Sequence, residues 1–323
     1  PILVALAFRI TNPMYTFTGT PPIFISDLNR FGHYLVGTSW LNLYWILCTA
    51  VLMMIGKVFW NRGFFSSTKE RLRMAKERLT TITTIAFVVL LVAFIAVAGY
   101  SHYNLSFLNT ILNGHTSEKV NADAEKKYAK YIGSAHPQIT DLKAYIDIFP
   151  EERTIKAKGD FKIINSYDTP IDTLRLEIVY PGEHTTLEKV MYNGIHLSPV
   201  MTDSIYRVYF YKLPKTMLSQ EKADLTIEVF SETKGFANRL ETQVLTNGSF
   251  LNHTIFPRFH YNQSIVDNGV RVKHGLKKLD YLFSPRTDSA ALKKNLFNED
   301  ANYINFEAVV STSGNQIALA PGK

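Results

Sequence analysis

The sequence predicts a membrane α-helical hairpin of two transmembrane helices, followed by an all-β antiparallel sandwich domain. Three observations support this fold class. Two long apolar runs without charged residues lie in the first third of the chain, a basic segment separates them, and apolar residues alternate with polar ones beyond residue 139. The chain of 323 residues has a single cysteine, Cys48, which excludes a disulfide scaffold. Its 13% aromatic content excludes a disordered chain.

The first apolar run lies between Arg30 and Lys57, and the second covers 82–99. Both fit the roughly 20 apolar residues that a bilayer span requires, with a buried helix of a soluble protein as the alternative. Aromatic residues typical of a membrane interface stand near the ends of the runs: Tyr44, Trp45, Trp60, Tyr100 and Tyr103. Neither run has a charged residue near its centre, so we expect scaffold helices and no ion path.

Basic residues are concentrated between the two runs. Before His115 there are nine Lys and Arg against three Asp and Glu, and seven of the nine lie between the runs: Lys57, Arg62, Lys69, Arg71, Arg73, Lys76 and Arg78. The positive-inside rule therefore predicts that this loop is cytoplasmic and that the chain beyond about Tyr100 is extracytoplasmic. Because the basic excess is not on a folded domain, nucleic acid is not an expected partner. Ser67-x-x-Glu70 predicts a capped helix within the loop.

The predicted domains follow from these features. Residues 1–38 are the tail of an earlier span (Pro1–Phe8) and an extracytoplasmic loop, so we expect a piece of a longer, multi-pass protein. Residues 39–103 form the two transmembrane helices with the basic loop at 61–81, residues 104–138 are a linker with a helix-capable stretch, and residues 139–323 form the β-sandwich.

The β-domain is predicted from apolar residues at every second position. Residues 142–148 and 155–163 alternate around a turn at Pro150–Arg153, which predicts a hairpin with one wet face. Asn193-Gly194 is a strong signal for a second hairpin. Further strands are expected at 174–178, 206–211, 225–229 and 304–310, with these side chains pointing inward: Ile146, Ile148, Phe161, Ile163, Leu174 and Leu176.

Two blocks of the chain resemble known families. The block from Asp141 to Lys323 resembles the N-terminal β-domain of aminopeptidase N-like zinc metallopeptidases, through LKAYIDIFPEERTIKAKGDFKIIN, the Leu174-x-Leu176 strand, the Asn193-Gly194 turn and NFEAVVSTSGNQIALAPG. The first block, with LNLYWILCTAVLM, the turn WNRG and the helix RLRMAKERL, is similar to the last helices of an ABC-transporter permease. Bacterial proteins that fuse the two carry both blocks in this order.

The resemblance implies the membrane-anchoring and substrate-capping section of a permease–aminopeptidase fusion in the bacterial inner (cytoplasmic) membrane. Its partners would be the lipid bilayer, an ATP-binding transporter subunit and a peptide substrate, and zinc would lie in a downstream domain. The alternatives are a non-enzymatic, membrane-anchored β-sandwich that binds a ligand, and the external domain of an ABC-type transport subunit.

The family's chemistry requires His-Glu-x-x-His on a helix, and none of the nine histidines has that spacing. The Gly-x-Met-Glu-Asn motif that grips the substrate amine and the Gly-x4-Gly-Lys-[Ser/Thr] loop of ATPases are also absent. We therefore expect no catalytic residue, no metal ligand, no bound zinc and no peptidase activity in this piece itself.

Polar residues around Pro257 are the remaining site candidates. The family's β-domain contacts the substrate's N-terminus from a segment preceding such a proline, and by that resemblance the candidates are Asn247 and Asn252. His253 and His260 match no standard ligand spacing, which favours a structural loop over a metal site. Nothing pairs the acids Asp267, Asp280, Asp288 and Asp300, and Ser249, Ser264 and Ser311 lack a nucleophile elbow.

Overall fold

The computed structural model falls into two compact units, which are described separately. The first contains Pro1–Ile111 with Lys234–Arg239, and the second contains Leu112–Thr233 with Leu240–Lys323. The structure describes residues 12–16, 23, 25, 30–32, 34–60, 67–109, 114–179, 184–236, 244–246, 248–261, 267–279, 287–289, 302–314 and 316–320. Pro1–Phe8, predicted as the tail of a span, and residues 61–63 of the WNRG turn lie outside the described residues.

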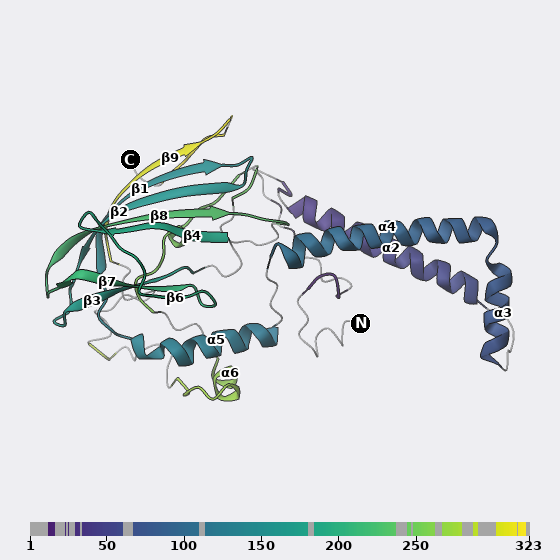
Figure 1. Cartoon of the computed structure of the whole chain (residues 1–323), viewed down its shortest axis with the longest axis horizontal. Helices are drawn as coiled ribbons and strands as arrows, with labels where there is room; N and C mark the ends of the chain where they lie inside the picture. Colours follow the sequence, from purple (N-terminus) through teal and green to yellow (C-terminus); the bar gives the residue numbers. More distant parts are fainter. Residues whose placement is uncertain are drawn as a thin grey trace. The chain divides into compact units, whose positions relative to one another are not determined.

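The first unit is built on a helical hairpin. Helix α2 (Tyr34–Phe59) and helix α4 (Thr81–His102) run side by side and contain the two predicted apolar runs (Figure 1). A π-helical turn, η1 (Tyr103–Phe107), extends α4. Both long helices are apolar and long enough to cross a membrane. Their apolar runs are therefore helical as predicted.

The basic connection contains helix α3 (Thr68–Arg78). Ser67 is its N-cap, as the capping signal predicts, because the Ser67 side chain accepts a hydrogen bond from the amide of Glu70 at 3.3 Å. Thr80 caps α4 in the same way through the amide of Thr83. The Arg78 guanidinium donates to the carbonyl oxygen of Val58 at 3.3 Å, which fastens the end of α3 to the end of α2.

Aromatic rings join the two long helices. Trp40 and Tyr100 lie 4.4 Å apart between ring centroids, and Tyr44 stacks on Phe94 at 5.5 Å. The side chain of Leu41 is fully buried in a cluster with Met14, Leu105 and Phe236. Of the residues predicted as interfacial anchors, Tyr44 and Tyr100 thus also pack within the hairpin, whereas Trp60 is 68% exposed.

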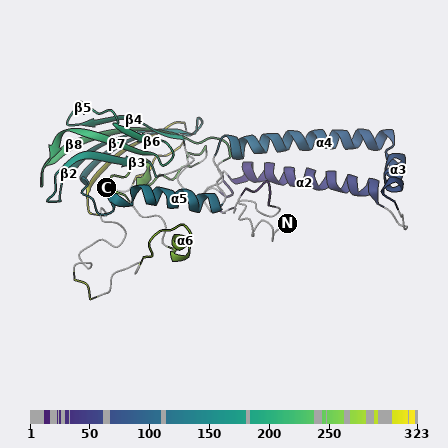
Figure 2. The same ribbon diagram turned by 60° about the horizontal axis from the view of Figure 1, so that its bottom comes forward.

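The second unit contains two sheets (Figures 1 and 2). The larger has the strand order β5-β4-β8-β2-β1-β9, and the smaller has the order β3-β7-β6. The strands are β1 (Gln138–Phe149), β2 (Thr154–Ile164), β3 (Ile171–Glu177), β4 (His184–Tyr192), β5 (Ile195–His196), β6 (Met201–Asp203), β7 (Val208–Met217), β8 (Lys222–Glu232) and β9 (Asn305–Thr312). The helices are α5 (Gly114–Tyr128), η2 (Ala129–Tyr131), η3 (His253–Ile255) and α6 (Asn268–Lys273).

The prediction of an all-antiparallel, all-β sandwich is corrected by this topology. Strand β9 pairs in parallel with β1, so the six-stranded sheet is mixed, and the unit also includes α5 and α6. Alternation of apolar residues indicates which face of a strand is buried. It does not indicate whether an edge strand runs parallel or antiparallel to its neighbour. The direction of β9 follows from a connection of more than 70 residues from β8, which local sequence does not specify.

The two sheets share one hydrophobic core. Four of the side chains predicted to point inward are at most 2% exposed: Phe161, Ile163, Leu174 and Leu176. The other two, Ile146 and Ile148, are half-buried in β1. The predicted Asn193-Gly194 turn joins β4 to β5, and both residues have positive φ angles, 47° and 81°, as a type I′ turn requires.

Helix α5 overlaps the stretch predicted to be helix-capable, residues 117–135, and packs on the smaller sheet. Its Tyr128 is 2% exposed and contacts Val208 and Phe210 of β7. The Tyr128 hydroxyl donates to Asp203 of β6 at 2.5 Å, and the ammonium of Lys127 bonds the same carboxylate. Burial alone would raise the pKa of Asp203, but these donors hold it below its ordinary value.

Replacing Asp203 with asparagine is expected to lower the free energy of unfolding at pH 7 by about 1–3 kcal/mol, because a charged acceptor of several hydrogen bonds is lost. Since the folded-state pKa is depressed, the carboxylate stabilises the fold above its unfolded pKa of about 3.9, and that contribution disappears as the pH falls through the folded value. Urea unfolding of both proteins at pH 7 and pH 3 checks this. The difference should shrink in acid, and a constant difference would contradict the ionic role.

Candidate functional site: an apolar pocket under strands β1 and β9

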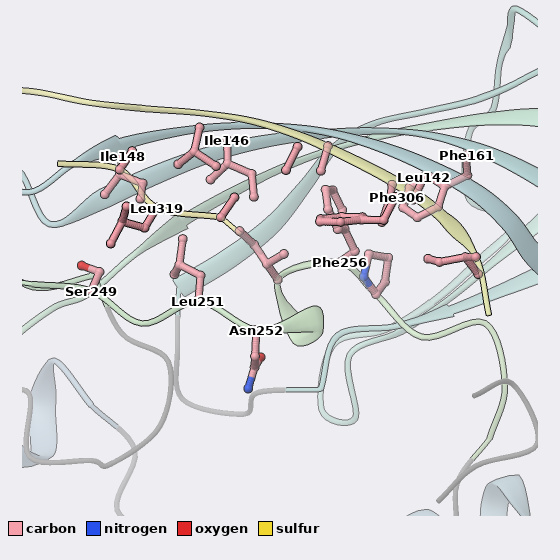
Figure 3. Close-up of a pocket in the computed structure, with 18 of the residues that line it drawn as sticks. Leu142, Ile146, Ile148, Phe161, Ser249, Leu251, Asn252, Phe256, Phe306 and Leu319 are labelled. Atoms are coloured by element: carbon pink, nitrogen blue, oxygen red, sulfur yellow. The ribbon is translucent and has the colours of Figure 1, made fainter. Parts of the chain in front are cut away.

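A pocket of about 890 Å³ lies in the second unit, beneath one face of β1 and β9 (Figure 3). Its opposite wall is built from residues 248–260 and 316–320. Such a volume is typical of small-molecule and peptide side-chain sites. The pocket is the candidate site because it gathers segments that are far apart in sequence.

The roof of the pocket is set by the register between β1 and β9. Leu142 pairs with Phe306, Ala144 with Ala308, Ile146 with Val310 and Ile148 with Thr312, and all eight side chains line the pocket. Adjacent residues of a strand point to opposite faces, so the pairs between them lie on the outer face of the sheet. One strand pair thus presents an apolar row to the pocket and a polar row away from it.

The polar row fixes this register. The Asn305 amide donates to Asp141 at 2.8 Å, the Ser311 hydroxyl donates to Asp147 at 2.5 Å, and Lys143 pairs with Glu307 at 2.9 Å. The hydrogen bonds from Asn305 and Thr140 hold the pKa of Asp141 below its ordinary value. A slip by one residue would break all three contacts and reverse the apolar row.

Aromatic packing holds the opposite wall. Phe256 and Phe259 meet the ring of Phe161 edge-on, with centroids 5.3 and 5.8 Å away. Near the other end, the Gln316 amide donates to the carbonyl of Thr246 at 2.7 Å, and the Ser249 hydroxyl accepts from the amide of Leu245 at 2.9 Å. The hydrogen bonds found for the Ser249 hydroxyl are therefore structural contacts with the backbone of Leu245.

The described lining residues include no Asp, Glu or Lys, and Arg258 is the one formally charged residue among them. Ser249 and His260 both line the pocket, and the hydrogen bonds found for the Ser249 hydroxyl are to the backbone of Leu245. The chemistry of the pocket therefore suits the binding of apolar groups.

Histidines meet at one end of the pocket. His260 lines it, and its ring centroid lies 5.6 Å from that of His136, whose Nε2 is 3.2 Å from the hydroxyl of Tyr167. The Nδ1 of His136 is 2.8 Å from the carbonyl of Ser134. No group of three or more His, Cys, Asp or Glu able to hold a metal occurs in the described part of the chain. Since a catalytic zinc takes three protein ligands, these residues do not fit one, and we derive no zinc chemistry for them.

Of the two asparagines predicted to contact a substrate amine, Asn247 lies outside the described residues. Asn252 is exposed and is the N-cap of η3, where its Oδ1 accepts from the amide of Thr254 at 3.1 Å. Its amide points away from β1 and β9 (Figure 3). The structure thus gives Asn252 a capping role, and its contact with substrate stays a prediction.

The other candidates do not converge. Asp267 is the N-cap of α6, accepting from the amide of Val270 at 2.9 Å, and the side chain of Ser311 bonds Asp147 on the outer face of the sheet. Asp280, Asp300 and Ser264, together with the side chain of His253, are outside the described residues. Sequence reasoning missed the pocket, although the alternation in 304–310 marks one of its walls.

Comparison with known proteins finds weak structural similarity and no sequence match. No family model and no curated protein matches the sequence. The structural neighbours include an M1 zinc metallopeptidase from Deinococcus radiodurans, with 12% identity, a TM-score of 0.25, and coverage of 30% of this chain and 21% of that one. They also include native leukotriene A4 hydrolase from Saccharomyces cerevisiae, with 11% identity, a TM-score of 0.24, and coverage of 29% and 15%. The chain thus spans about a fifth or less of these neighbours, which belong to the M1 zinc metallopeptidases, and TM-scores this low carry no inference of function.

Proposed function

We propose that this chain is the membrane-anchoring and substrate-capping section of a bacterial permease–aminopeptidase fusion. The observation that carries the proposal is the joining, in one chain, of an apolar helical hairpin with a basic connection to a β-domain whose sequence resembles that of aminopeptidase N-like enzymes. In the longer protein, zinc and the catalytic residues would belong to another domain, and an ATP-binding subunit would drive the permease.

The surface of the helical hairpin supports membrane anchoring. Large apolar side chains of α4 are not covered by other parts of the described chain: Ile82 is 81% exposed, Val89 63% and Val92 60%. Keeping so much apolar surface in water costs about 25 cal/mol per Å², whereas a lipid environment removes that cost. Helix α3 contributes five of the seven basic residues between the two helices, which favours a cytoplasmic loop.

The β-domain would act as the cap. Its apolar pocket suits a surface that borders a peptide cleft. By the family resemblance, Asn247 or Asn252 would contact the substrate's free amine. The zinc-dependent step itself is assigned to no residue of this chain.

A pair of topology reporters tests the anchoring. Alkaline phosphatase, active only outside the cytoplasm, and green fluorescent protein, which does not fluoresce when exported unfolded, are each fused after residue 135 and after residue 70. We expect phosphatase activity only from the fusion at 135 and fluorescence only from the fusion at 70, because the basic loop is retained inside.

A charge variant provides the control. Replacing Lys69, Arg71, Arg73 and Lys76 with glutamine should reduce this asymmetry between the two fusion sites. Phosphatase activity at 70 with none at 135 would reverse the topology and remove the extracytoplasmic cap. Fluorescence at both sites, with the chain in the soluble fraction, would remove the membrane anchor.

A further inference from the structure

The outer edge of β9 has no neighbouring strand among the described residues. β9 is the last strand of the six-stranded sheet, and its partner in the described residues is β1 on one side only. No hydrogen bond to the outer edge of Asn305–Thr312 is found within the described part of the chain. An edge strand of eight residues carries a row of backbone donors and acceptors along that side, which are satisfied by water or by another strand.

The sequence of β9 does little to block pairing. Proteins commonly protect an edge with Lys, Pro or a bulge, and β9 reads NFEAVVST without Lys or Pro. Its pairing with β1 is continuous from Asn305 to Thr312, with no register shift. Its one charged residue, Glu307, is paired with Lys143 on the polar face of the sheet. The edge is thus long, regular and nearly uncharged.

The two faces beside this edge differ in polarity. On the pocket side, the Phe306 side chain of β9 is 47% exposed, and Ile317 and Leu319 on the opposite wall of the pocket are 85% and 88% exposed. On the other side lie the polar contacts of Asn305, Glu307 and Ser311 with β1. A strand added beside β9 would therefore place alternate side chains against an apolar surface and against a polar one.

We propose that the outer edge of β9 is a docking site for an extended peptide that joins the six-stranded sheet as a seventh strand. A peptide fits because its backbone supplies donors and acceptors to match those of β9, which a lipid chain cannot do. Apolar side chains of the peptide at every second position would cover Phe306 on the pocket side, and the intervening polar ones would lie beside Glu307 and Ser311. This site is independent of the membrane anchoring and of the fusion partner proposed above.

The test uses the whole chain in lipid nanodiscs and a fluorescent twelve-residue probe that alternates threonine with valine, with a lysine at each end for solubility. Fluorescence anisotropy should show saturable binding. A second probe of the same sequence is N-methylated at every backbone amide, which removes the donors along both of its edges. We expect its affinity to fall at least tenfold, because strand addition depends on backbone hydrogen bonds. Empty nanodiscs provide the blank.

Three variants locate the site. Val309→Lys places a long charged side chain on the edge strand and should reduce binding at least tenfold, whereas Val309→Thr keeps a β-branched residue and should bind normally. Val200→Lys makes the same change at an exposed valine outside β9 and should have no effect. Far-UV circular dichroism confirms that each variant keeps its sheet content.

Several results would overturn the proposal. Equal binding of the two probes would reduce the contact to apolar association without strand pairing. Unchanged binding of the probe to Val309→Lys, or no saturable binding to the unmodified chain, would show that the peptide does not bind at the edge of β9. A dimer seen by sedimentation that Val309→Lys abolishes would show that a second copy, and not a separate peptide, occupies β9.

Discussion

Replacing Arg271 with alanine is expected to lower the free energy of unfolding of the second unit by about 3–5 kcal/mol. Arg271 of α6 is 3% exposed and forms a two-pronged ion pair with Glu125 of α5, which is 2% exposed. The guanidinium donates to the two carboxylate oxygens at 3.0 and 2.6 Å and to the carbonyl of Lys277 at 2.6 Å. The truncation would leave a buried carboxylate without its guanidinium, which is costly because the charge remains desolvated.

Urea unfolding followed by the near-ultraviolet circular dichroism of tyrosine measures this loss. All three tryptophans lie in the first 60 residues, so the tyrosine signal is better suited to the second unit. Lys212→Ala is the matched control, because it removes an ion pair with Asp172 whose side chains are 57% and 55% exposed. Exposed pairs contribute about 0–1 kcal/mol. Equal losses in the two variants would contradict the role of burial.

A double variant separates charge from packing. Replacing Glu125 with leucine and Arg271 with methionine together removes both charges and keeps most of the side-chain volume. Buried ion pairs exchanged for apolar residues of similar size are often neutral or stabilising. The double variant should therefore be more stable than Arg271→Ala, and a further loss would show that the pair itself stabilises the fold.

Local patterns in the sequence predict much of this fold. The apolar runs, the capping serine at 67 and the Asn193-Gly194 turn each depend on neighbouring residues, and the structure contains the helices and the hairpin that they predict. The side chains of Phe161 and Leu174 are buried for the same reason, since alternation on a strand separates the two faces.

What sequence alone does not predict is pairing at long range. Glu125 and Arg271 are 146 residues apart, and β9 meets β1 across more than 150 residues. The sequence around Glu125 or Arg271 does not reveal their pairing. A charged residue in a predicted helix gives the same sequence pattern whether its side chain faces water or a buried counterion. The pocket depends on both its roof and residues 248–260, so it could not be found before the strand order was known.

The candidate contact at Asn252 illustrates the same limit. The sequence Asn252-His253-Thr254 fits a loop beside a cleft and equally fits a cap of a short helix. In the structure the Asn252 side chain caps η3, a bond that forms with a residue only two positions away. Local hydrogen bonding thus explains this residue type without any ligand. A contact with a substrate's amine, which donates its hydrogen bond, would have to share the Oδ1 atom that already accepts from Thr254.

Replacing Phe161 with alanine is expected to cost about 3–5 kcal/mol of the free energy of unfolding, the range for truncating a large aromatic side chain in a core. Phe161 is 2% exposed in β2, and its ring packs between the sheets against Phe256 and Phe259. The rings of Phe256 and Phe259 form part of one wall of the pocket. Removing the Phe161 ring, on which both pack, should therefore also loosen that wall. Urea unfolding gives the energy, and faster hydrogen exchange at residues 255–260 would report the wall.

Gly159 makes this prediction sharper. A Cβ atom at Gly159 would lie 2.7 Å from Cζ of Phe161 and 2.9 Å from Cε1 of Phe256, closer than real Cβ contacts. Gly159→Ala should therefore destabilise the wild-type core by about 1–3 kcal/mol through overpacking. In the Phe161→Ala background the added methyl group would enter the space left by the ring, so its cost should shrink markedly. Strictly additive losses in the double variant would mean that the Phe161 ring does not occupy the space beside Gly159, and the assigned packing of the pocket wall would be wrong.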